Sequence, residues 1–142
     1  MSHLEENKAI VRRFVEAVNA RDYDALEAIT APDIVRHCPA TPDVVVRSRE
    51  DLRRFLTRDA EIFPDNRVQL DTVTAEGNLV AFWATYTGTQ KGAMGSFAAS
   101  GKRVSVEFAG VFRMEDGRIA DVRLVWDNVT LLRQLGHLSA AL

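Results

Sequence analysis

Four runs of residues typical of β-strands fill the second half of the sequence, and they constrain the fold more than any other feature. Taken together, the runs are rich in Val, Phe, Tyr, Trp and Thr. The runs span residues 67–75, 79–89, 103–115 and 118–127. Glu76-Gly77-Asn78 and Glu115-Asp116-Gly117 separate neighbouring runs, as tight hairpin turns do. The pattern predicts a long antiparallel sheet.

The first half has the spacing of helices. Ser2 followed by Glu5 is a capping-box pattern, and apolar residues at helical spacing then predict a helix to about Asn19. A shorter pattern ends before Pro32, and a third helix is expected between Ser48 and Pro64. Residues 33–46 are expected to be a loop or a short extended stretch. Helices followed by strands predict an α+β fold in which helices cover one face of a curved sheet.

The composition narrows the classes of protein that fit. A chain of 142 residues is expected to be one domain spanning 1–142. The net charge of −2 leaves no basic stripe for a nucleic-acid partner. We expect no membrane span, because no apolar run is long enough, and the polar N-terminus does not resemble a signal peptide. The single cysteine, Cys38, suits a reducing interior, so a cytoplasmic location is expected.

Aromatic side chains are candidates for lining a cavity in such a cone-shaped fold, although plain core packing is the alternative for each of them. They are Phe14, Phe55, Phe63, Trp83, Phe108 and Trp126. A small hydrophobic ligand is the expected occupant. Residues 79–87 are apolar at both strand parities, so one face can pack on the helices and the other in a subunit interface. A homodimer through the sheet is therefore expected.

Motifs for cofactor or metal chemistry are not found. The sequence has no GxGxxG, GxxxxGK[ST], GxSxG or HExxH, so we expect no cofactor. His3, His37 and His137 lack the spacing of metal ligands, and no metal site is expected. The remaining option is acid–base chemistry by carboxylates and a histidine.

Asp127 is the strongest candidate for this chemistry, and it has two interpretations. It ends a largely apolar strand, where an apolar environment would raise its pKa and make it a usable base. It also directly precedes a short helical pattern, where an Asp is a favoured N-cap. Capping would lower the pKa, because the hydrogen bonds favour the charged form. The local sequence leaves both roles open.

Two further polar residues are candidates. His37 lies in the expected loop and is either solvated or a polar partner in a site. Glu107 lies in the middle of an apolar strand and either reaches a pocket or pairs across strands, with Arg123 as one possible partner.

Two long segments resemble one known family. GKRVSVEFAGVFRMEDGRIADVRLVWDNVTLLRQLG (101–136) resembles the C-terminal half of the SnoaL-like polyketide cyclases and ester cyclases, and EENKAIVRRFVEAVNARDYDALEAITAPDIVRH (5–37) resembles their N-terminal helices. The family belongs to the NTF2-like, ketosteroid-isomerase-like superfamily, whose fold is an α+β cone. Asp127, nine positions before the Gly of RQLG, matches the position that the family's cyclases use as general acid and base.

The resemblance implies ring closure without a cofactor, by an intramolecular aldol reaction with Asp127 and His37 as catalytic residues. Phe14, Phe55, Trp83, Glu107, Phe108 and Arg123 would contact the substrate. Two features depart from the family pattern. Gly110 stands where the cyclases carry a histidine, and residues 91–101 lack the prolines of the ester cyclases.

Two alternatives remain on the same scaffold. An isomerase or epoxide hydrolase is one of them, since Asp121, Arg123 and Asp127 share a strand parity that suits an Asp–Arg–Asp set. A non-catalytic protein that binds a small molecule is the other.

Overall fold

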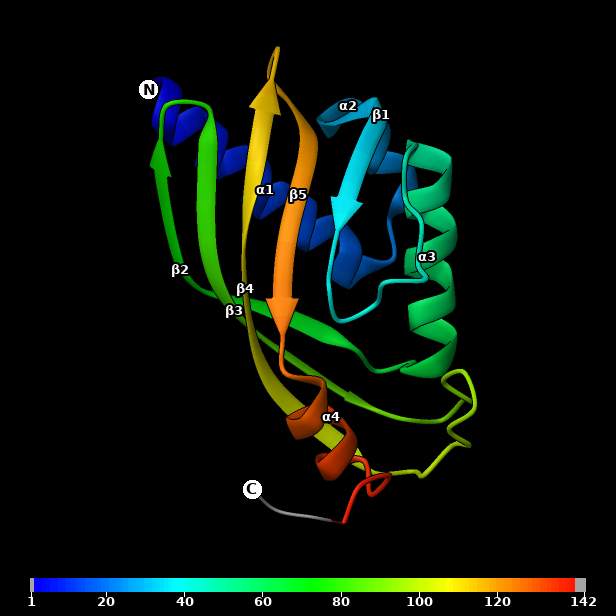
Figure 1. Ribbon diagram of the computed structural model, residues 1–142. Helices are drawn as coiled ribbons and strands as arrows, with labels where there is room; N and C mark the ends of the chain where they lie inside the picture. Colours follow the sequence, from blue (N-terminus) through cyan, green and yellow to red (C-terminus); the bar gives the residue numbers. More distant parts are fainter. Residues whose placement is uncertain (1, 140–142) are drawn as a thin grey trace.

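The computed structural model describes residues 2–139 and places the helices mainly before the strands, as the sequence predicts (Figure 1). The helical elements are α1 (His3–Ala20), the 3₁₀ turn η1 (Tyr23–Ala25), α2 (Leu26–Ile29), α3 (Arg49–Ile62) and α4 (Asn128–Gln134). The strands are β1 (Thr30–His37), β2 (Arg67–Glu76), β3 (Leu79–Thr89), β4 (Arg103–Glu115) and β5 (Arg118–Trp126). Within the described residues, no helix is long and apolar enough to cross a membrane.

The two long helices begin at the predicted caps. The hydroxyl of Ser2 accepts a hydrogen bond from the backbone N–H of Glu5, at 3.2 Å. The hydroxyl of Ser48 accepts one from the backbone N–H of Asp51, at 3.0 Å. Each bond satisfies a donor that the first turn of a helix leaves unpaired.

The sheet has the strand order β1-β5-β4-β3-β2, and its last four strands are antiparallel. Asp116 and Gly117 both have positive φ, at 52° and 75°, as a two-residue type I′ turn requires. Gly77, in the other turn, has φ 58°. The predicted antiparallel strands and their tight turns are therefore confirmed.

Residues 33–46 were expected to be a loop or a short extended stretch, and the first of them, residues 33–37, are extended as the end of β1, which spans residues 30–37. This strand pairs in parallel with β5, so that Arg36 lies opposite Val122 and the sheet is mixed. The register shifts between Thr30 and Val35, around Pro32. A proline is tolerated there because β1 is an edge strand, where a missing N–H costs no ladder hydrogen bond.

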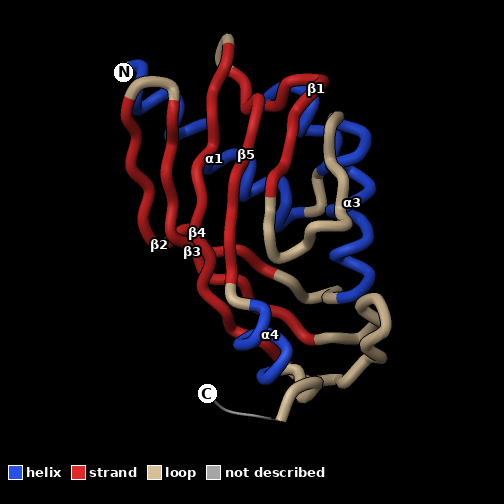
Figure 2. The backbone as a smooth tube through the Cα atoms, viewed as in Figure 1, coloured by secondary structure: helices blue, strands red, loops and turns tan. Residues whose placement is uncertain are grey.

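The sheet has two faces with different surroundings. Its inner face packs against α1 and α3 in the main core, which contains Val80, Phe82 and Phe112 of the strands. No helix among residues 2–139 covers its outer face, and Trp83 is exposed there (Figure 1). Figure 2 shows that β3 and β4 bend along their length, so the inner face is concave.

Gly110 of β4 lies in close contact with the backbone of β5 and with the ring of Phe82 on β3. A Cβ atom at this position would overlap the carbonyl oxygen of Arg123 and would lie 2.9 Å from the ring of Phe82. The aromatic ring and the neighbouring backbone therefore occupy the space that a side chain would need. The packing around position 110 therefore has room for a glycine and not for the histidine of the family pattern.

The Gly110→Ala variant should be strongly destabilised, by about 3 kcal/mol, because neither the backbone oxygen nor the packed ring can move away cheaply. Gly88→Ala is the matched control in β3, since its Cβ would lie 3.2 Å from the nearest heavy atom, the Cβ of Phe63. Urea denaturation of both variants measures the difference. Equal stabilities of the two variants would contradict this account of the packing.

Candidate functional site

A polar cluster lies between α3 and the inner face of the sheet, and its centre is Asp59. The Oδ2 atom of Asp59 accepts hydrogen bonds from the hydroxyl of Tyr86, at 2.8 Å, and from the amide of Asn66, at 2.7 Å. Oδ1 accepts no hydrogen bond from the described residues. Because every sealed side-chain N or O atom in those residues has a partner, Oδ1 must retain contact with solvent.

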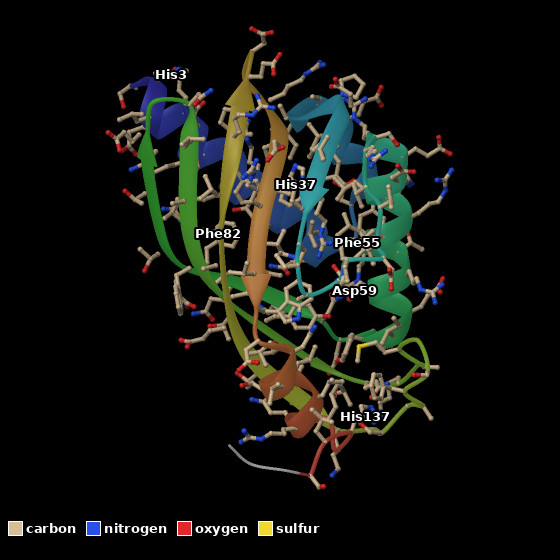
Figure 3. All side chains as sticks on the ribbon, viewed as in Figure 1. His3, His37, Phe55, Asp59, Phe82 and His137 are labelled. Atoms are coloured by element: carbon tan, nitrogen blue, oxygen red, sulfur yellow. The ribbon has the colours of Figure 1, made fainter. Side chains whose placement is uncertain are left out.

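The elements around Asp59 fix its position. Asp59 follows Phe55 by four residues on α3, so both side chains point from one face of the helix toward the sheet (Figure 3). Tyr86 lies on β3, and its ring packs edge-on against Phe63 with the ring centres 5.7 Å apart. The backbone N–H of Asn66 donates to the carbonyl of Phe63, at 3.0 Å. The carboxylate of Asp59 on α3 therefore binds both β3 and the connection that follows α3.

The surroundings of Asp59 change its proton affinity. Burial raises its pKa, and the hydrogen bonds from Tyr86 and Asn66 and the charge of Arg36 offset this only in part. Burial also raises the pKa of Tyr86, and the neighbouring carboxylate raises it further, so the phenol stays protonated as a donor. A carboxyl group whose pKa is raised by burial binds a proton more tightly than an ordinary carboxylate, and its free oxygen is the atom that can exchange it.

Arg36 is a cation near this cluster, and it is only 8% exposed. Its guanidinium lies 4.1 Å from the ring centre of Phe55 and 5.8 Å from that of Trp126. One Nη atom donates to the hydroxyl of Thr41, at 3.1 Å. Burial lowers the pKa of Arg36, but a guanidinium remains charged in a protein. The interior therefore contains a carboxyl group with a raised pKa and a permanent cation near each other.

Asp127 caps α4. One carboxylate oxygen accepts from the backbone N–H of Val129, at 2.9 Å, and the other from the hydroxyl of Thr130, at 2.7 Å. The side chain is exposed, and its hydrogen bond from Thr130 is the main cause that lowers its pKa. The cap interpretation is confirmed, and the environment does not raise the pKa as the alternative role required. A role of Asp127 as a base stays a prediction.

The other polar candidates face outward. His37 lies on β1 and contacts Asp121 of β5, with Nε2 and Oδ2 3.0 Å apart. Arg123 and Glu107 are exposed, and within the described residues neither has an ion-pair partner, so the suggested pair between them is wrong. Asp121, Arg123 and Asp127 share a strand parity as predicted. The carboxylate of Asp121 contacts His37, and that of Asp127 caps α4.

The aromatic candidates divide between the two faces. Phe14 packs edge-on against Phe112, with ring centres 5.6 Å apart, and Phe108 packs against Phe82 at the same distance. Phe55 reaches Arg36, as described above. Trp83 was expected to line the interior, which is wrong, because it is 48% exposed on the outer face.

Four residues of this cluster were not predicted from the sequence: Arg36, Asp59, Asn66 and Tyr86. A signal was present for Asp59, which follows the aromatic Phe55 by four residues and so lies on the same face of its helix. Arg36 likewise follows the buried Ile34 by two residues in what proved to be a strand. Within residues 2–139, no group of three or more His, Cys, Asp or Glu side chains is arranged to hold a metal ion.

Comparison with known proteins identifies the family. The family model described as SnoaL-like polyketide cyclase matches residues 8–135. The chain belongs to the SnoaL-like polyketide cyclase family. Among curated proteins, none matches the sequence.

Solved structures of other proteins share the fold of this SnoaL-like chain. TsrD from Streptomyces laurentii is 30% identical, with a TM-score of 0.85 over 97% of this chain and 99% of that one. IdmH from Streptomyces antibioticus, a candidate polyketide cyclase, is 29% identical, with a TM-score of 0.80 over 92% and 98%. An epoxide hydrolase of the LEH-like type from M. tuberculosis is 22% identical, with a TM-score of 0.76 over 94% and 92%, and shares the fold alone.

The raised pKa of Asp59 predicts a pH-dependent stability. The folded SnoaL-like chain holds this proton more tightly than the unfolded chain, in which the pKa is near 3.8. The free energy of unfolding should therefore fall as the pH rises from the unfolded pKa through the folded pKa. In Asp59→Asn this contribution is lost, so the variant should gain stability relative to the wild type as the pH rises. Urea denaturation from acid to neutral pH measures the difference, and a constant difference would contradict the assignment.

Proposed function

We propose that this protein is a cofactor-independent cyclase that closes a ring by an intramolecular aldol-type reaction. Its substrate is a small, hydrophobic, carbonyl-rich molecule such as a polyketide. Membership of the SnoaL-like family supports the reaction class. The observation that carries the proposal for this chain is Asp59, a carboxyl group with a raised pKa and a free Oδ1, surrounded by Phe55, Tyr86 and the cation of Arg36.

The proposed reaction needs one group that moves a proton twice. Asp59 takes a proton from a carbon flanked by two carbonyls, and the resulting enolate carbon attacks a ketone of the same molecule. The alkoxide that forms takes the proton back from Asp59, so the product is an isomer of the substrate. Because a carbon between two carbonyls is already acidic, modest general-base catalysis is sufficient, and the interior contributes mainly by holding the chain folded.

The proposal assigns Asp127 a smaller role than the family resemblance gives it. Its carboxylate is exposed and its pKa is lowered, so it is a weaker base than Asp59 near neutral pH. The cap that it provides orders α4 at the rim of the inner face. The reaction is proposed to occur in the cytoplasm, where the free thiol of Cys38 would stay reduced.

Asp59→Asn should slow proton abstraction by about 100-fold or more, since positioned acid–base groups contribute about that much. Exchange of the acidic C–H of an aryl β-keto ester for deuterium, followed by NMR, measures this step without the natural substrate. Asp127→Asn should retain most of the rate, because asparagine can still cap the helix.

The outcomes of this comparison separate the possible functions. Loss of exchange in Asp127→Asn alone would return the role of base to Asp127. A wild-type rate no faster than buffer, together with tight ligand binding, would favour a non-catalytic binding protein.

We also propose that the protein is a homodimer through the outer face of the sheet. Trp83, Ala109 and Val125 lie side by side on β3, β4 and β5 in the strand register. Leu79, Trp83 and Val125 are 43%, 48% and 54% exposed. An exposed apolar patch across three strands of an uncovered sheet face is typical of a subunit interface.

Trp83→Glu should convert the dimer to a monomer, because the charge would be buried without a partner at the centre of the patch. Sedimentation equilibrium measures the mass of the particle. Leu4→Glu is the control, since Leu4 is also an exposed apolar residue but lies on α1. A wild-type chain that sediments as a monomer would contradict the proposal.

A further inference from the structure

Arg36 is a buried cation without a carboxylate partner. None of the ion pairs among the described residues includes it. A guanidinium has five N–H donors, and within those residues the only side chain or carbonyl oxygen that accepts from it by hydrogen-bond geometry is the hydroxyl of Thr41. The side chain of Cys38 lies beside the guanidinium and interacts favourably with it, and Asp59 adds a favourable charge interaction without forming an ion pair.

The remaining N–H donors of Arg36 are open to solvent, because every sealed side-chain N or O atom in the described residues has a partner. The rest of the side chain is buried, and a buried charge is normally paired because removing an unpaired ion from water is costly. The cation–π contacts with Phe55 and Trp126 recover part of this cost. They leave the in-plane N–H groups other than the one that donates to Thr41 available to a ligand, because aromatic rings interact with the flat faces of the guanidinium.

The geometry points to a ligand. We propose that Arg36 is a binding site for the carboxylate of a planar aromatic ligand, which the guanidinium holds through its free N–H groups between Phe55 and Trp126. This inference rests on the proposed function, since it names the class of substrate for the same interior: an aromatic acid whose reacting carbon faces Asp59. A carboxylate matches the fork of a guanidinium with two parallel hydrogen bonds.

The ring of Phe55, which stacks on Arg36, also borders an open groove. An open groove of about 670 Å³ runs between α3 and the segment of Val44 and Val45, and Phe55 forms part of its wall. The backbone N–H of Arg36 donates to the carbonyl of Val46, at 3.1 Å, so this segment lies directly along β1. Phe55 therefore contacts the guanidinium with its ring and also forms part of the wall of this groove.

The two tryptophans of the chain allow the site to be located by fluorescence. Trp126 lies beside Arg36, whereas Trp83 lies on the outer face. The Trp83→Phe variant keeps Trp126 as its single indole. In this background, 4-nitrobenzoate should quench the fluorescence with saturation, and 4-nitrobenzamide, which has the same shape without the charge, should bind at least about tenfold more weakly.

Substitution of Arg36 tests the residue itself. Arg36→Met keeps the apolar stem and should weaken binding of 4-nitrobenzoate at least about tenfold without weakening that of 4-nitrobenzamide. Arg36→Lys should recover only part of the affinity, since lysine lacks the planar fork. Arg118→Met is the matched control, because Arg118 is an exposed arginine at the start of β5.

Each outcome decides the proposal. Equal affinities for the acid and the amide would overturn it, and so would unchanged binding in Arg36→Met, which would leave Arg36 a packing residue only. If Arg36→Met does not fold, the preference for the acid and the quenching of Trp126 in the Trp83→Phe background decide it. Asp59→Asn should still bind the acid, so a loss of proton exchange with intact binding separates the test of catalysis from the test of this site.

Discussion

The hydrogen bonds that Tyr86 and Asn66 donate to Asp59 connect the parts of the molecule on which the interior depends. They join α3 to β3 and to the connection before β2, so the helix cannot shift along the sheet without leaving a buried donor unpaired. An unpaired donor of this kind costs about 1–3 kcal/mol. Phe55 and Asp59 therefore keep a fixed distance from the sheet. The cation of Arg36 then lies between this helix and the aromatic end of β5.

Strand alternation sorts the functional candidates between the two faces. On β5, Val122, Leu124 and Trp126 point inward, whereas the alternate residues Arg123 and Val125 are exposed on the outer face. The carboxylates near the end of the chain thus lie outside the interior, where they pair with His37 or cap α4. Chemistry inside must come from groups on other elements. The cluster of Asp59 and Arg36 places a carboxyl group from α3 and a cation from β1 there.

Local patterns in the sequence predicted the parts of the fold that depend on local physics. Neighbouring residues predict the helix caps at Ser2 and Ser48, the turn at Asp116 and Gly117, and the four antiparallel strands. All of these features are confirmed. β1 was missed at its start because a proline normally excludes a strand, and only the edge position permits it. The partners of Asp59 come from two other segments, and no short window contains them. The sequence named two roles for Asp127, and only its contacts distinguish them.

The parallel pairing of β1 with β5 has a consequence for the order of folding. Thr30 lies opposite Ile119, so the first strand of the chain pairs with the last. During synthesis, β1 leaves the ribosome long before its partner exists, and contacts between distant segments close late because their loop entropy must be overcome first. Arg36 belongs to β1 and Trp126 to β5. The aromatic enclosure of this cation can therefore form only when the C-terminal strand docks, which makes the interior one of the last regions of the molecule to be completed.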